Sequence, residues 1–142
     1  MSAVTRLVTF VEVDAEAPDG RRISFSARHE AVLADGRRRT LLDDRGWTEA
    51  IRGAPPGADF WTLTAAEDIE DTARAVVGPD EPPDGVSHEA AEADHWAWMA
   101  EVLQRQGVAV DAQTLAQLPH DVVLSEPLRA RLAAQAADFE PG

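Results

Sequence analysis

An alternation of apolar and polar residues runs from residue 4 to about residue 44, and it constrains the fold of this chain more than any other feature. The alternating residues are largely β-branched or aromatic. Because successive side chains of a strand point to opposite faces, this pattern is typical of β-strands. Turn sequences interrupt it at residues 18–20 (Pro-Asp-Gly) and 35–36 (Asp-Gly). Short turns of this kind join neighbouring antiparallel strands, so they predict an N-terminal meander.

The second strand of this meander, at residues 22–33, shows which face is buried. One face carries apolar side chains and a histidine: Ile23, Phe25, Ala27, His29, Ala31 and Leu33. Arginine, serine and glutamate occupy the other face, which is the pattern of a strand with solvent on one side. We predict a third strand near residues 38–42 and a fourth at residues 59–63, which carries Phe60 and Trp61.

Helix signals replace strand signals after residue 64. Four helices are predicted to begin at caps: Thr64 (a capping box with Glu67), Ser87, Asp111 and Ser125. Strands followed by helices are the order of an α+β domain. We therefore expect an antiparallel meander of three to four strands followed by three to four helices packed on one face of the sheet. Residues 1–142 would form a single domain, mainly strands over 1–64 and mainly helices over 65–142.

Charge is divided unevenly along the chain. The net charge is -13, from 26 acidic and 13 basic residues. Residues 1–52 hold nine arginines and nine acidic residues, whereas residues 53–128 hold two arginines and fifteen acidic residues, a balance of -13. The net charge therefore lies on the helical part. Such a field repels nucleic acid and anionic membranes and attracts a basic partner.

The composition excludes several other classes of protein. The chain has no cysteine, which removes disulfides, thiolate metal sites and cysteine nucleophiles. It also lacks an apolar stretch of the ~18 residues that a membrane span needs, so we expect a cytoplasmic protein without a membrane partner. Gly-rich phosphate loops and Gly-x-Ser-x-Gly elbows do not occur. No cofactor is expected.

The preferred hypothesis is a non-enzymatic interaction module of the immunity, inhibitor or adaptor type. Its acidic helical face would bind a basic protein partner by electrostatically steered association. The predicted contact residues are Glu67, Asp68, Glu70, Asp71, Asp80 and Glu81. Self-association as a homodimer, through a sheet edge or a tryptophan patch, is compatible with this hypothesis.

The alternative is a small enzyme or ligand-binding protein with a histidine-lined pocket. If the longest predicted helix, residues 88–106, packs across the sheet, its side chains meet the histidine on the apolar strand face. The predicted lining residues are His29, His95, Trp96 and Trp98. Histidines in an apolar cleft are candidates for proton transfer because their pKa values are readily shifted.

A divalent metal is a variant of the same alternative. Helical spacing places His88 and Glu92 on the same apolar arc as His95, and Glu92-x-x-His95 matches an element of carboxylate di-iron sites. His88 and His95 lie roughly 10 Å apart along the helix axis, which is too far for both to bind one ion comfortably. The predicted metal ligands are His88, Glu92, His95 and His120.

Overall fold

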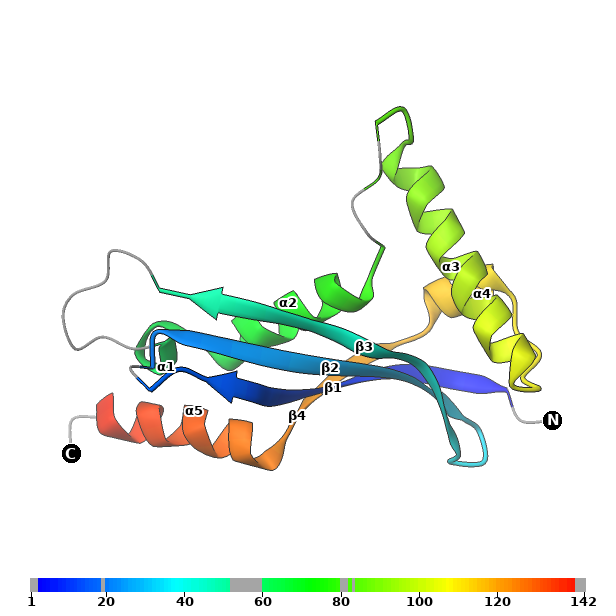
Figure 1. Ribbon diagram of the computed structural model, residues 1–142. Coiled ribbons are helices and arrows are strands. Elements are labelled where there is room, and N and C mark those ends of the chain that lie inside the picture. Colours follow the sequence, from blue (N-terminus) through cyan, green and yellow to red (C-terminus); the bar gives the residue numbers. More distant parts are fainter. Residues whose placement is uncertain (1–2, 19, 52–59, 80–81, 83, 140–142) are drawn as a thin grey trace.

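The structure is a computed structural model that describes residues 3–18, 20–51, 60–79, 82 and 84–139 (Figure 1). Within the described residues, three strands are followed by four helical segments, a fourth strand and a last helix. They are β1 (Val4–Glu16), β2 (Arg22–Leu33), β3 (Arg38–Ala50), α1 (Phe60–Leu63), α2 (Ala66–Val77), α3 (His88–Arg105), α4 (Ala112–Gln117), β4 (His120–Leu124) and α5 (Glu126–Phe139). None of the described helices is long and apolar enough to cross a membrane.

The strands form one sheet in the order β3-β2-β1-β4. The first three strands are an antiparallel meander, and β4 joins the free edge of β1 in parallel, with Leu7 opposite His120 and Val11 opposite Leu124. The apolar face of β2 is buried, whereas Ser24, Ser26 and Arg28 on the other face reach solvent. These features confirm the predicted α+β fold with helices packed on one face of the sheet.

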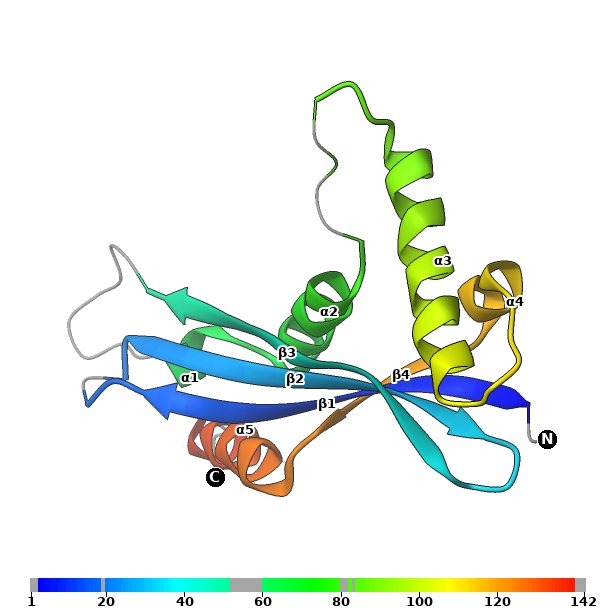
Figure 2. The ribbon, with the colours of Figure 1, turned by 45° about the vertical axis from the view of Figure 1, so that its right-hand side comes forward.

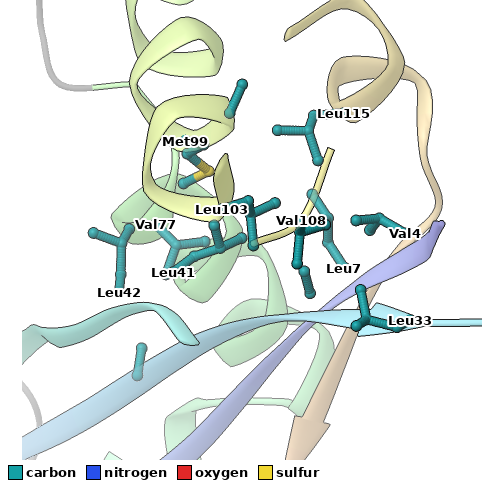
Figure 3. Packing of buried hydrophobic residues seen from close by; sticks show 13 residues of the cluster. Val4, Leu7, Leu33, Leu41, Leu42, Val77, Met99, Leu103, Val108 and Leu115 are labelled. Carbon is teal, nitrogen blue, oxygen red and sulfur yellow. The ribbon is translucent and has the colours of Figure 1, made fainter. Parts of the chain in front are cut away.

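The helices bury two adjoining apolar clusters against the covered face of the sheet. In the first cluster, Met99 and Leu103 of α3 and Leu115 of α4 pack above Leu7 and Leu41 (Figure 3). The second cluster lies beneath α1, α2 and α5. Its members are Val11, Ile23, Phe25, Phe60, Trp61, Ile69, Ala73, Leu124 and Leu128. Because α3 and α5 cover different ends of the sheet, the two clusters meet in the middle of β1.

Two strand predictions are wrong. The described part of the predicted strand at residues 59–63 is instead the single helical turn α1, which begins where Phe60 N donates to Gly20 O at 2.9 Å. The fourth strand is β4, which the chain adds after most of its helices. In addition, β3 continues to Ala50, past register shifts in its pairing with β2, although we predicted its end near residue 42.

The start of α2 also differs in detail from the prediction. Its N-cap is Ala65, and the Asp68 carboxylate accepts a hydrogen bond from Ala65 N at 3.1 Å. The capping box predicted from Thr64 and Glu67 is therefore shifted by one residue. Ser87 and Asp111 cap α3 and α4 as predicted, because their side chains accept hydrogen bonds from Ala90 N and Thr114 N.

Candidate functional site

A hydroxyl and two imidazoles meet where the two apolar clusters adjoin. Thr9 Oγ1 lies 2.8 Å from His29 Nδ1 and 2.7 Å from His120 Nε2, and the two imidazole rings are edge to face with centroids 4.9 Å apart. Thr9 is fully buried and His29 is 2% exposed, whereas His120 is half-buried. We call these three residues the Thr9 cluster. Strands β1, β2 and β4 each supply one member, so the register of the sheet sets its geometry.

Burial keeps both histidines of this cluster neutral. Desolvation, followed by repulsion from His120 and His95, lowers the pKa of His29 to about 3. The pKa of His120 is also lowered, by burial and then by the nearby Arg74, against a smaller opposing effect of Asp121. A hydroxyl has one proton, so it donates to one imidazole and accepts from the other. The Thr9 hydroxyl therefore joins half-buried His120 and buried His29 in one chain of hydrogen bonds, whose direction is set by the tautomers of the two neutral rings.

The structure assembles only part of the predicted histidine pocket. His95 is half-buried on α3, its ring packs against Trp96 with centroids 5.2 Å apart, and it is close enough to repel a proton on His29. Trp98 is 44% exposed, so its side chain lies largely in solvent. His120, which we predicted as a metal ligand, belongs instead to the hydrogen-bonded Thr9 cluster.

The predicted four-ligand metal site is not assembled. His88 and Glu92 are exposed, although we placed them on the buried side of the helix with His95. The N-terminal half of α3 stands away from the sheet, and only its C-terminal half packs on the first cluster (Figure 2). Among the residues that the structure describes, no three His, Asp or Glu side chains are grouped so that they could hold a metal ion.

The predicted partner-binding carboxylates of α2 lie largely in solvent. Glu67, Asp68 and Asp71 are exposed, and Glu70 is half-buried. Asp68 also caps the helix, and Asp71 pairs with Arg74 at 3.6 Å. Asp80 and Glu81 lie outside the described residues. The apolar residues of α2 that pack on the sheet, Ile69, Ala73 and Val77, lie on the other side of the helix from Asp68 and Asp71, which face outward, whereas half-buried Glu70 lies beside them.

Helix α3 adds a second group of exposed carboxylates. They are Glu89, Glu92, Asp94 and Glu101. Together with Glu67, Asp68 and Asp71 of α2, we call them the acidic helical surface. The exposed indole of Trp98 lies one helical turn from both Asp94 and Glu101. Arg105 pairs with Glu101 at 2.7 Å, while several strand arginines pair within the sheet, as Arg6 does with Asp121 at 3.1 Å.

Sequence reasoning missed Thr9. The signal for it was a polar residue at an inward position, because Leu7 and Val11 on either side of it face the apolar clusters. It also missed a polar group on the open face of the sheet. There, Glu30 is buried between Arg28 and Arg38, at 3.5 and 3.6 Å.

Comparison with protein-family models, with curated proteins and with solved structures found no match for this chain. What the protein does must therefore be inferred from its own side chains. Two features stand out in the described residues, the buried Thr9 cluster and the exposed acidic helical surface. They lie on different elements: the Thr9 cluster is built from β1, β2 and β4, whereas Trp98 and its neighbouring carboxylates on α3 face solvent.

Proposed function

We propose that the protein is a non-enzymatic interaction module, of the immunity, inhibitor or adaptor type, that binds a basic protein through the acidic helical surface. The observation that carries this proposal is the 44% exposure of Trp98 on a helix whose first turns stand away from the sheet (Figure 2). Asp94 and Glu101 lie one turn before and one turn after this indole. Large exposed aromatic side chains of this kind are enriched among the residues that anchor interfaces.

The chemistry of this surface favours arginine or lysine on the partner. A cation held over an indole face contributes ~0.5–1 kcal/mol at an exposed site, and more when water is excluded. Asp94 can pair with the same cation. Glu101 already pairs with Arg105 at 2.7 Å, and it can pair with a cation of the partner in place of Arg105 or together with it. The carboxylates of α2 add to the field that draws a basic partner in and so raise the association rate.

Calorimetric titration with a nona-arginine peptide tests the proposal. We expect binding that weakens steeply with added salt. Trp98→Ala combined with Asp94→Asn and Glu101→Gln should reduce the affinity about tenfold, which corresponds to the sum of one cation–π contact and two exposed ion pairs. The matched control is Glu12→Gln with Asp14→Asn, which removes two charges from β1. The proposal fails if this control weakens binding as much as the triple variant does.

A small-molecule site at the Thr9 cluster is the second candidate. It is favoured by a hydroxyl that bridges two neutral imidazoles, one of which, His120, is half-buried. Titration with Zn²⁺, followed by NMR of the histidine ring nitrogens, separates a ligand site from a structural one. A saturable shift confined to His29 and His120 would support a ligand site, and unchanged ring signals would leave the cluster a structural role.

A further inference from the structure

A groove of about 400 Å³ runs beside β4 at the edge of the sheet. Its floor is the strand itself, one wall is α2 and the other is α5. The lining residues are Ala66, Glu70, Val122, Val123, Leu124, Arg129 and Leu132. Most of this lining is apolar, and Val123 is 40% exposed. The groove belongs neither to the Thr9 cluster nor to the acidic helical surface.

The backbone of β4 offers hydrogen-bonding groups to this groove. In a parallel pair of strands, alternate residues direct both their N–H and C=O groups toward the neighbour. Leu7 N donates to Pro119 O at 2.8 Å and Ser125 N donates to Val11 O at 2.9 Å, so Pro119, Ser125 and the odd-numbered residues between them face β1. The N–H and C=O groups of His120, Val122 and Leu124 therefore point away from β1.

An unpaired strand edge is a template for a further strand. Natural edges are usually blocked by bulges, prolines or inward-pointing charges. The pairing of β1 with β4 runs in register from Leu7 to Val11 without a bulge, and Val122 to Leu124 carry no charge. In the described structure this edge is bordered by an apolar groove. The occupant that fits both features is an extended peptide segment.

The walls of the groove indicate the chemistry of that segment. Half-buried Glu70 lines it from α2 and Arg129 lines it from α5, so the two walls carry opposite charges. A complementary segment has a basic residue on the α2 side and an acidic residue on the α5 side, and its apolar residues contact Val122 and Leu132. We propose that β4 accepts an extended segment of this kind from a partner protein as a fifth strand. This site goes beyond the proposed function, because it depends on backbone pairing and not on the acidic helical surface.

Two peptides and one protein variant test the proposal. The probe is the acetylated and amidated pentapeptide Arg-Val-Val-Glu-Val, in which Arg and Glu point to opposite faces of an extended chain. Its control carries N-methyl groups on alternate residues, which removes the amides that pair with a strand edge. We expect saturable amide shifts at Val122 and Leu124 with the first peptide, and at least tenfold weaker binding of the methylated one. Val122→Pro removes an outward N–H but no bond to β1, so it should also weaken binding about tenfold. Val122→Ala keeps the N–H and should bind more tightly than Val122→Pro.

Four results would overturn the proposal. Equal binding of both peptides would show apolar contact without strand pairing, and shifts confined to Trp98 and its neighbours would show a general electrostatic effect. Absence of binding would exclude the site. Sedimentation equilibrium that finds a dimer, reduced to monomer by Val122→Pro, would assign the edge to a second copy of the chain. If Val122→Pro does not fold, the comparison of the two peptides on the wild-type protein still tests the proposal.

Asp94→Asn should leave pentapeptide binding unchanged, so this test is separate from that of the proposed function.

Discussion

Acidification from pH 7 to pH 4 should destabilise the wild-type protein by about 3 kcal/mol relative to a Thr9→Val, His29→Leu double variant. In the folded state His29 remains neutral because burial lowers its pKa to about 3. An unfolded chain protonates this side chain near its ordinary pKa of 6.5. Between these two values the unfolded state binds more protons. The stabilising contribution is therefore complete above pH 6.5 and is lost progressively as the pH falls toward 3.

Urea denaturation of both proteins at several pH values measures this difference. Other groups, including the many carboxylates, titrate in both proteins and largely cancel when the two free energies of unfolding are subtracted. His88→Gln is the matched control, because His88 is exposed, and its pH dependence should follow the wild type. Parallel stability curves for the wild type and the double variant would contradict the account of a buried, neutral His29.

Trp61→Ala should reduce the free energy of unfolding by about 3–5 kcal/mol, the usual range for a buried aromatic side chain. Trp61 is 2% exposed, and its Nε1 donates to Glu16 Oε1 at 2.9 Å. The guanidinium of Arg131 lies 4.8 Å from the ring centroid and pairs with the same carboxylate at 2.9 Å. Removing the indole leaves a cavity and removes the two contacts by which α1 is tied to Glu16 of β1 and to Arg131 of α5.

Two further tryptophan variants show whether burial causes this loss. Trp61→Phe keeps most of the volume but gives up the hydrogen bond to Glu16, so we expect a loss of about 1–2 kcal/mol. Trp98→Ala should change stability by less than ~0.5 kcal/mol, because that side chain is largely in solvent. Thermal or urea unfolding measures the stability of all three variants, Trp61→Ala, Trp61→Phe and Trp98→Ala. Equal losses at Trp61 and Trp98 would contradict the assignment of one to the core and the other to a surface.

Local patterns predicted most of this fold. The alternation in β2 identified its buried face, and capping residues located α3 and α4. The wrong strand prediction at residues 59–63, and the missed strand at residues 120–124, have a physical cause. A short apolar run fits a strand or a helical turn equally well, and tertiary partners decide between them. Phe60 N is held by Gly20 O, whereas residues 120–124 pair with β1, which lies far away in the sequence.

The candidate sites were predictable only in part. The inward position of His29 followed from strand parity, but its contact with His120 depends on the parallel pairing of β1 with β4, which local sequence does not reveal. Periodicity likewise placed His88 and Glu92 on the same arc as His95. Periodicity could not show that the first turns of α3, which carry His88 and Glu92, stand away from the sheet. Helical spacing gives the direction of a side chain around the axis, but it does not show which turns pack on a neighbour.

The central claim is that negative charge is concentrated on the outward surfaces of α2 and α3, while the open face of the sheet is close to neutral. Paramagnetic relaxation of backbone amides by two soluble nitroxides, one cationic and one neutral, measures this distribution directly. The relaxation enhancement by the cationic nitroxide, divided by that of the neutral one, reports the local potential near each amide.

We predict ratios well above one near Glu67, Asp71 and Asp94, and ratios close to one near Ser24 and Ser26 on the open face. Addition of salt should bring the high ratios down, because screening acts on exposed charges. Uniform ratios over the whole molecule, or the highest values on the open face of the sheet, would contradict the account and leave the acidic helical surface without a role in binding.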